Sequence, residues 1–399
     1  MMGVEVLNFG CRLNIAEGEA IRVAAAGAGD LVVVNSCAVT KEAARQARQA
    51  VRRAARSGRR VLVTGCAAQL DPAGFAAMHE VAGVIGNREK RLARSYRGDA
   101  RVSDIFAPSP LSRPVVSGRD HARAFVEVQT GCDHRCTFCI IPFARGNSAS
   151  APPEAVVEAI SIAVAGGQRE AVLTGVDLTS YGGGLGALVE RILRDVPKLA
   201  RLRLSSLDPV EVEPLLFELL TSEPRMMPHV HLSLQAGDDL ILKRMKRRHC
   251  RAQAVTLVER LKAARPEIAI GADLIAGFPT EDEAMAANSL ALIDDCDVVF
   301  GHIFPFSPRA GTPAARMPQV PSAVARERAA RLRERSAQRK AAWLANLVGS
   351  EQSVLVERDG VSGHAENFAR VRFAPATPGG IARLGIERSD GDRLHGTAA

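Results

Sequence analysis

Aromatic residues are scarce in this chain of 399 residues, where they make up 4% and include one Trp and two Tyr. Proteins that bind single-stranded nucleic acid without sequence preference stack successive bases on aromatic side chains, and this composition excludes such an extended platform. Any contact with nucleic acid must therefore rely on Arg and Lys, which give the chain a formal net charge of +8. A basic balance of this kind favours a polyanionic partner.

Long apolar runs are also missing. No stretch of about 18 uncharged apolar residues occurs, so the sequence predicts no membrane-spanning helix. The first five residues do not combine a basic segment with an apolar one, as a secretion signal would. We therefore expect a cytoplasmic protein with no membrane partner, and the length predicts two or three domains.

The chain has eight cysteines. Because the cytosol keeps thiols reduced, they indicate metal ligation or redox chemistry rather than a disulfide framework. Three of them, Cys11, Cys37 and Cys66, each follow a short apolar run, and stretches of helical composition separate the runs. This pattern predicts a parallel sheet whose strands end at one edge, where the three thiols could reach a common centre. The alternative is three buried apolar thiols.

Six further apolar runs alternate with helical segments in the middle of the chain. They favour a parallel, curved sheet, most simply an open (β/α)6 partial barrel with its active site at the carboxyl ends of the strands. The runs are 124–129, 171–176, 201–206, 229–234, 268–275 and 297–304.

The fold class that we predict is therefore α/β, with a small all-β module at the C-terminus. The last 50 residues contain two β-like runs separated by Gly-containing turns, and they carry six Arg against seven acids. The expected boundaries are a parallel α/β domain at 1–105, a Pro- and Ser-containing linker at 106–118, the partial barrel at 119–320, a basic helix at 321–349 and the β module at 350–399.

The strongest motif is a C-x3-C-x2-C triplet directly after the first run of the barrel, formed by Cys132, Cys136 and Cys139. Such a loop can hold three irons of a [4Fe–4S] cluster and leave the fourth iron open for a non-protein ligand. Structural zinc is the competing interpretation, but zinc prefers four ligands, and the nearby His134 lies between two of the cysteines. The motif therefore favours an iron-sulfur cluster.

This motif on alternating strands and helices resembles the radical S-adenosylmethionine (SAM) superfamily. The resemblance implies that the open iron binds the methionine end of SAM, and that an electron from the cluster cleaves the cofactor to a 5′-deoxyadenosyl radical. It also implies cofactor contacts at barrel strand ends, although polar groups there often only cap turns. The residues concerned are Thr174, Gly175, Asp177, Ser233, Gln235 and Asp273.

Over nearly its whole length the chain resembles the methylthiotransferases, most closely those acting on N6-threonylcarbamoyladenosine in tRNA. The similarity lies in residues 8–14, 131–148, 173–182, 354–357 and 363–371. It implies a second [4Fe–4S] cluster on Cys11, Cys37 and Cys66, and replacement of the adenine C2 hydrogen by a methylthio group beside the anticodon. It further implies an RNA-binding, TRAM-like module at the C-terminus. Ala67 and Phe143 depart from the family, which commonly has Tyr at both places.

Two basic helices are the physical indication of tRNA binding. Residues 41–60 contain eight basic residues and one acid, and residues 321–348 contain seven against two. In the first helix the spacing puts four cations on one face, although solvated arginines on a basic surface would give the same pattern. They are Arg45, Arg48, Arg52 and Arg56. Arg145 is expected either to pair with a carboxylate or phosphate near the cluster or to lie on the surface.

The leading hypothesis is a two-cluster radical methylthiotransferase on tRNA that uses SAM, an electron donor and a sulfur source. One alternative keeps the chemistry and changes the substrate to isopentenyladenosine in tRNA or to an aspartate of a ribosomal protein. The other alternative is an iron-sulfur protein for RNA binding or electron transfer, without radical chemistry.

Overall fold

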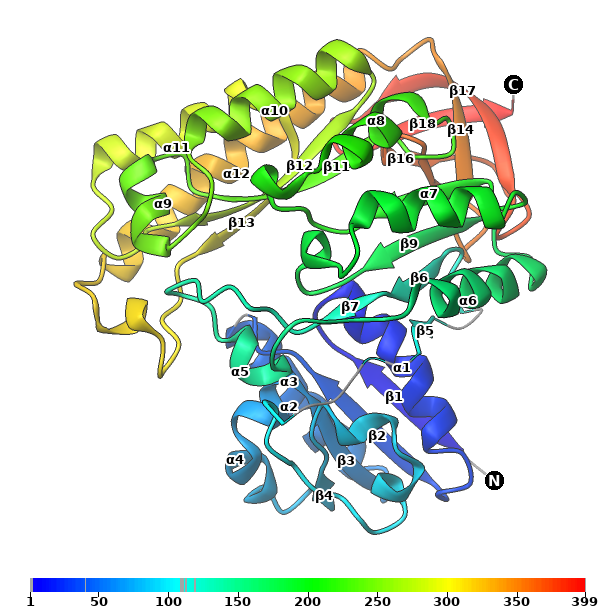
Figure 1. The fold of residues 1–399 in the computed structure, drawn as a ribbon, viewed down its shortest axis with the longest axis vertical. Coiled ribbons are helices and arrows are strands. Elements are labelled where there is room, and N and C mark those ends of the chain that lie inside the picture. The colour runs from blue at the N-terminus through cyan, green and yellow to red at the C-terminus, as the bar shows by residue number, and fades with distance from the viewer. Residues whose placement is uncertain (1–2, 40, 108–110, 112, 118–119, 399) are drawn as a thin grey trace.

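The computed structural model describes residues 3–39, 41–107, 111, 113–117 and 120–398. A parallel sheet, a curved parallel sheet and a small closed barrel follow one another along the chain, as Figure 1 shows. The predicted α/β fold class is confirmed. The predicted linker falls partly on residues 108–110, 112 and 118, which lie outside the described residues. Among the described residues, no α-helix combines the length and the hydropathy that a membrane span requires.

The N-terminal sheet has the strand order β1-β2-β3-β4, and its strands are parallel. Helices cover both faces, so β2 is buried over its whole length. Val32 packs with Val51 of α2 on one face, whereas Val33 packs with Ile21 of α1 on the other. The elements are β1 (Val4–Asn8), α1 (Arg12–Ala24), β2 (Leu31–Ser36), α2 (Lys41–Ala55), β3 (Arg60–Gly65), α3 (Cys66–Leu70), α4 (Pro72–Ala76) and β4 (Gly83–Val84).

The register of this sheet brings the ends of its first three strands to one edge. Asn8 pairs with Asn35, and Ser36 pairs with Gly65. The residues that follow these pairs, Cys37 and Cys66 among them, therefore lie next to one another at that edge.

The central sheet contains all six predicted strands, as β6 and β9 to β13. The order is β10-β9-β6-β5 in one part and β11-β12-β13 in the other. An isolated parallel bridge joins Leu207, after β10, to Leu232 of β11, and another joins Leu202 of β10 to Met226, which precedes β11. The sequence did not predict β5, a two-residue antiparallel edge strand. The strands are β5 (Val115–Val116), β6 (Ala124–Glu127), β7 (Gln129–Thr130), β8 (Ala149–Ser150), β9 (Glu170–Thr174), β10 (Arg201–Leu204), β11 (His229–Gln235), β12 (Ala269–Ala276) and β13 (Val298–Pro305).

Alternate residues of the central strands face the helices outside the sheet. Leu232, Ala272 and Leu274 belong to the core beneath those helices, so His231 and Asp273 lie on the opposite, inner face. The helices are α5 (Ile141–Arg145), α6 (Pro153–Ala165), α7 (Leu185–Asp195), α8 (Pro214–Ser222), α9 (Asp239–Met245), α10 (Arg251–Ala264) and α11 (Glu283–Asp295).

The C-terminal strands form a closed barrel in the order β14-β15-β16-β18-β17. Leu344 near the end of the preceding helix α12 packs into its core with Val354 and Val371. The predicted helix and both predicted β-like runs are present. The elements are α12 (Ser322–Ala345), β14 (Glu351–Val356), β15 (Ser362–Ala365), β16 (Arg370–Arg372), β17 (Ile381–Ser389) and β18 (Leu394–Ala398).

The small barrel docks on the central sheet through Phe368 and a group of arginines. The ring of Phe368 lies 4.8 Å from that of His229 and 4.7 Å from that of His364, measured between centroids. Arg203 of β10 donates hydrogen bonds of 2.8 Å to the carbonyls of Ala365 and Glu366. This contact fixes the C-terminal barrel relative to the inner face of the central sheet.

Candidate functional site

A short strand pair closes the loop that carries the C-x3-C-x2-C triplet. Gln129 of β7 pairs with Ser150 of β8, so residues 131–148 return to their starting point. Gly131 has φ +70°, and a Cβ there would collide with the carbonyl of Asn147. The backbone N–H of Cys132 donates to the carbonyl of Gly146 at 3.1 Å. The loop is therefore tightly packed around its first cysteine, and only glycine fits at Gly131.

Gln129 joins this loop to the end of β9. Its amide nitrogen donates to the carbonyl of Gly131 at 2.9 Å, and its amide oxygen accepts from the backbone N–H groups of Val176 and Asp177, both at 2.9 Å. A Cβ at Gly175 would lie 2.8 Å from the same oxygen. This buried amide positions the turn at Asp177 against the cysteine loop, and no sequence signal had indicated it.

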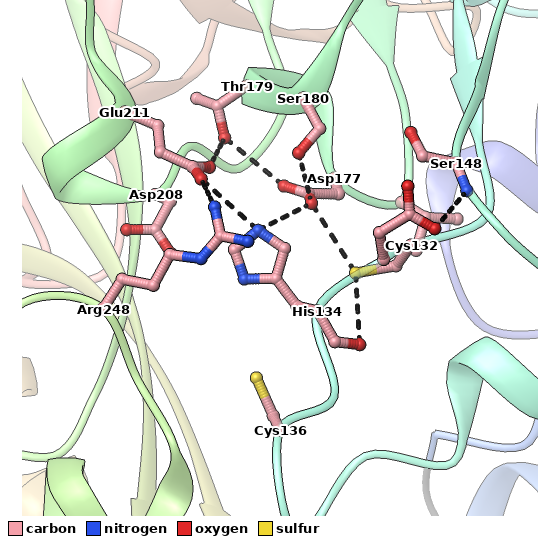
Figure 2. A network of polar contacts seen from close by, with 12 residues as sticks. Cys132, His134, Cys136, Ser148, Asp177, Thr179, Ser180, Asp208, Glu211 and Arg248 are labelled. Carbon is pink, nitrogen blue, oxygen red and sulfur yellow. Dashed lines mark hydrogen bonds and ion pairs between the residues drawn. The ribbon is translucent and has the colours of Figure 1, made fainter.

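Asp177 is the centre of a polar network beside Cys132, which Figure 2 shows. Its carboxylate accepts from the hydroxyl of Ser180 at 2.6 Å, lies 3.2 Å from His134 Nε2 and 3.6 Å from the sulfur of Cys132. His134 also approaches Glu211 at 3.4 Å. The proximity of His134 lowers the pKa of Glu211 to about 2. The Nε2 atom of His134 lies beside two carboxylates, so this nitrogen is directed to Asp177 and Glu211 and not to a fourth position among the cysteines.

The other cysteines of this triplet face cations and buried surroundings. Arg247 donates to the sulfur of Cys136 at 3.6 Å and forms an ion pair of 2.6 Å with Asp208. Burial raises the pKa of Cys132 to about 12 and that of Cys139 to about 11. As free thiols these groups stay protonated, whereas metal coordination deprotonates a thiol outright. Together with Cys136 in the same packed loop, these two sulfurs fit the donor set of a [4Fe–4S] cluster.

The second triplet lies at the edge of the N-terminal sheet. Cys37 and Cys66 are buried and Cys11 is exposed, and the three sulfurs interact electrostatically with one another. A Cβ at Gly10, which has φ +93°, would collide with the side chain of Cys37. Burial raises the pKa of Cys37 to about 11. The topology therefore brings the three predicted thiols to one place, and their chemistry also fits an iron-sulfur cluster.

A buried ion network lies between the two triplets. Arg145, at the end of α5, donates to the sulfur of Cys66 at 3.1 Å and to both carboxylate oxygens of Glu17, at 3.0 and 2.9 Å. Lys90 forms a further ion pair of 2.6 Å with Glu17, and all three side chains are at most 3% exposed. The surface alternative for Arg145 is wrong, because this residue fastens the loop of one triplet to a sulfur of the other.

The remaining predicted cofactor residues lie at the carboxyl ends of strands or on the inner face. The hydroxyl of Thr174 is occupied by a hydrogen bond of 3.1 Å to the carbonyl of Val126. Ser233 offers its carbonyl to Arg247 at 3.0 Å, and Gln235 has φ 66°. The side chain of Asp177 points to Cys132, whereas Asp273 lies further along the inner face with two histidines.

Asp273 belongs to a second polar cluster on that face. His231 and His302 approach its carboxylate at 3.2 and 3.4 Å. Burial disfavours the carboxylate, but the hydrogen bonds from both histidines hold the pKa of Asp273 below its ordinary value. The sequence did not predict this cluster, because its members come from three strands.

The four arginines predicted to bind RNA differ in their surroundings. Arg45 is paired with Glu42 at 2.6 Å, Arg48 with Asp71 at 2.7 Å, and Arg52 approaches Glu80 at 3.9 Å. Arg56 is exposed one residue beyond α2, and it has no acceptor among the described residues.

The second basic helix is more fully neutralised. Arg328 pairs with Glu281 at 3.0 Å, Arg335 with Asp294 at 2.7 Å, and Arg339 with Asp297. The acids come from α11 and its flanks, so the positive excess in the sequence of α12 does not become a free cationic surface.

Two family models match this chain. The radical SAM superfamily matches residues 126–293, and the uncharacterized protein family UPF0004 matches residues 4–86. The first match implies a [4Fe–4S] cluster and SAM.

Curated relatives extend the similarity over nearly the whole chain. A threonylcarbamoyladenosine tRNA methylthiotransferase, MtaB, of Rickettsia prowazekii is 45% identical, and the alignment covers 92% of this chain and 91% of the relative. The protein of the same name from Thermotoga maritima is 33% identical, with coverages of 94% and 92%.

Among solved structures, the radical SAM methyltransferase TsrM from Kitasatospora setae superposes with a TM-score of 0.58 at 12% identity, covering 79% of this chain and 77% of that one. The cobalamin-dependent radical enzyme OxsB gives a TM-score of 0.52 at 11% identity, with coverages of 85% and 56%. These likenesses support the fold.

Proposed function

The chain belongs to the threonylcarbamoyladenosine tRNA methylthiotransferase family of radical SAM enzymes, and from this premise we propose how its residues serve that activity. The substrate is N6-threonylcarbamoyladenosine beside the anticodon of tRNA, and the product carries a methylthio group at C2 of the adenine. The observation that carries the assignment is the 45% identity over 92% of the chain. The two three-cysteine sites joined by Arg145 support it independently.

Cys132, Cys136 and Cys139 would hold the cluster that binds SAM. When bound, these groups supply a radical that removes hydrogen from an unreactive carbon, together with the methyl group of the product. The packed loop between β7 and β8 keeps the three sulfurs in place, and Arg247 compensates the charge of the Cys136 thiolate.

The cofactor would lie along the strand ends next to this loop. The carboxylate of Asp177, fixed by Ser180 and by the backbone contact with Gln129, is suited to an ammonium group of SAM. Gly175 lets the backbone after β9 pass close to the side chain of Gln129. The end of β11 at Ser233–Gln235 would line the same SAM site. Thr174 and Asp273 would contact the cofactor from further away.

Cys11, Cys37 and Cys66 would hold the second [4Fe–4S] cluster, on which sulfur is made available to the substrate. Arg145 contributes a cation that favours an anionic sulfur at Cys66. Its bidentate bond to Glu17 holds the N-terminal sheet and the radical loop in a fixed relation, which the transfer between two cofactors requires.

The proposed domain boundaries follow the predicted ones: 1–105, 119–320 and 350–399, with the linker at 106–118 and the helix at 321–349. We assign the closed C-terminal barrel as a TRAM-like RNA-binding module, which acts by shape and hydrogen bonds rather than by charge. Arg56 and, more weakly, its three neighbours on α2 would contact tRNA phosphates. The reaction also needs an electron donor and a sulfur source, and its tRNA substrate favours the cytoplasm as the place of action.

The test is mass spectrometry of tRNA nucleosides from a strain lacking this gene. Restoring the wild-type gene should recover 2-methylthio-N6-threonylcarbamoyladenosine, whereas Cys136→Ala should leave only the unmethylthiolated nucleoside. If that nucleoside is unaffected while an isopentenyladenosine derivative or a ribosomal protein loses its methylthio group, the substrate assignment is wrong.

A further inference from the structure

Three guanidinium groups surround Phe368 at the inner face of the central sheet. Arg203, Arg12 and Arg123 lie with their guanidinium carbons 5.2, 5.4 and 5.8 Å from the ring centroid. Arg203 and Arg123 both have acid partners, because Glu170 lies 2.9 Å from the first and 3.4 Å from the second. These two arginines therefore belong to the internal ion network that docks the C-terminal barrel.

Arg12 differs from them. It follows Cys11, begins α1 and is half-buried. In the part of the chain that the structure describes, no group accepts a hydrogen bond from it and no ion pair includes it. A half-buried guanidinium without a protein acceptor keeps its donors free, so this position favours a ligand with a negative charge.

The acids that Arg12 senses are already occupied. It interacts electrostatically with Glu170 and Asp273. Glu170 is shared by the arginines named above, and Asp273 accepts from His231 at 3.2 Å and from His302 at 3.4 Å. Among the described residues, neither carboxylate therefore makes a direct ion pair with Arg12, and its guanidinium is free to pair with a bound anion.

The proposed substrate carries such an anion. The threonylcarbamoyl group on N6 of the adenine ends in a carboxylate, whereas an isopentenyl group is uncharged and apolar. A guanidinium fork matches a carboxylate with two parallel hydrogen bonds. Arg12 is also the residue next to Cys11, so it lies beside the cysteine site from which sulfur would be delivered. Resting on the proposed function, we propose that Arg12 binds the threonyl carboxylate and selects this substrate.

The test measures binding to the anaerobically reconstituted full-length enzyme by fluorescence anisotropy. Three anticodon stem-loop RNAs are compared, bearing threonylcarbamoyladenosine, its carboxamide analogue, which lacks the negative charge, or plain adenosine. Wild type should prefer the carboxylate over the carboxamide by about tenfold to a hundredfold. Arg12→Gln should abolish this preference, and Arg12→Lys should keep part of it.

Matched variants separate the substrate contact from packing. Arg260→Gln removes a guanidinium that lies 4.6 Å from the ring of Phe217 on the outside of the sheet, and it should leave the preference unchanged. Arg12→Met also removes the guanidinium but keeps an aliphatic side chain against Phe368. It replaces Arg12→Gln in the test if that variant does not fold.

The binding results distinguish a failure of the role of Arg12 from a failure of the substrate assignment. A preference retained by both Arg12→Gln and Arg12→Met overturns the role of Arg12. If wild type binds the carboxylate and carboxamide RNAs equally but both better than plain adenosine, the role of Arg12 falls while the proposed function stands. If all three RNAs bind equally, the substrate assignment itself fails.

Discussion

The two cysteine triplets of this molecule reach similar chemistry by opposite routes. Cys132, Cys136 and Cys139 lie within eight residues of one loop, 131–148, which the β7–β8 pair closes. Cys11, Cys37 and Cys66 come from three strand ends and meet only because the sheet is parallel and in register. The spacing of cysteines within one loop is enough to predict a metal site from the sequence. A site assembled from separate strands can be predicted only once the topology of the sheet is considered.

Their electrostatic surroundings also differ. Cys132 faces the carboxylate of Asp177 at 3.6 Å, which suits a site that must receive a cationic cofactor. Cys66 instead receives an N–H from the buried Arg145, which suits a site that holds anionic sulfur. The proposed division of labour is therefore consistent with the carboxylate beside Cys132, although a cation also lies beside Cys136 in the first triplet.

Removing one ligand from each triplet should give the largest and most distinct effects. Cys136→Ala should abolish SAM cleavage and with it all methylthio transfer, because the cluster that we propose to bind SAM would lose one of its three ligands. Cys66→Ala should retain cleavage and lose only the transfer of sulfur. Liquid chromatography of 5′-deoxyadenosine and of the modified nucleoside measures both activities.

Cys250→Ser is the control for these variants, because Cys250 lies outside both triplets at the start of α10. Loss of SAM cleavage in Cys66→Ala, with the protein folded and the other cluster intact, would contradict the division of labour.

Glu17→Gln should destabilise the fold by about 3–5 kcal/mol, since it leaves Arg145 and Lys90 buried with incomplete compensation. Glu19→Gln, in a partly exposed pair with Arg22, should cost less than about 1 kcal/mol. Denaturant unfolding monitored by circular dichroism compares the two. If Glu17→Gln and Glu19→Gln have equal free energies of unfolding, the ion network between the triplets does not contribute to stability.

The stability that Glu17 contributes should fall as the pH is lowered. Burial disfavours the Glu17 carboxylate, but Arg145 and Lys90 hold its pKa below the ordinary value. Its contribution to stability is therefore complete at neutral pH and is lost as pH falls through the lowered pKa of the folded state. When the unfolding series is repeated in acid, the difference in the free energy of unfolding between wild type and Glu17→Gln should become smaller.

Asp177→Asn should weaken SAM binding by about tenfold or more, because the amide cannot neutralise the ammonium of the cofactor. Equilibrium dialysis with the reconstituted enzyme gives the Kd. Asp195→Asn, at an exposed carboxylate on α7 paired with neighbouring arginines, is the matched control. An unchanged Kd in Asp177→Asn would assign this carboxylate to positioning His134 and Ser180 alone.

The smallest expected effects are on tRNA affinity. Arg56→Gln should reduce the slope of log K against log salt by about 1, because an unpaired cation releases one counterion equivalent from the phosphates. Arg45→Gln should change the slope less, since Glu42 already neutralises Arg45. Filter binding over a salt series measures both slopes. A larger change in slope for Arg45→Gln than for Arg56→Gln would contradict this prediction.

Much of this architecture can be predicted from the sequence because the signals are local. The six apolar runs of the central sheet, the helix ending near Leu344 and the spacing of Cys132 to Cys139 depend on residues close together in the chain. Even the N-terminal triplet follows from three strands and the rule that parallel strands share their carboxyl edge.

The polar connections could not be predicted in this way. Arg145 bonds Glu17 across 128 positions, Gln129 bonds Asp177 across 48, and Arg203 bonds Ala365 across 162. Each is an Arg or Gln whose type alone indicates a surface residue, and only the tertiary fold reveals the acceptor. The sequence overestimated the free positive charge of α12 for the same reason, because its acid partners lie on α11 and its flanks.

The most direct test of two separate three-thiol sites is quantification of iron with Mössbauer spectroscopy after anaerobic reconstitution. Wild type should bind about eight irons as two [4Fe–4S] clusters, and a variant with Ala at Cys11, Cys37 and Cys66 should keep about four. The variant with Ala at Cys132, Cys136 and Cys139 should also keep about four, in the other site. A wild-type content of about four irons that the first triple variant leaves unchanged would contradict the account.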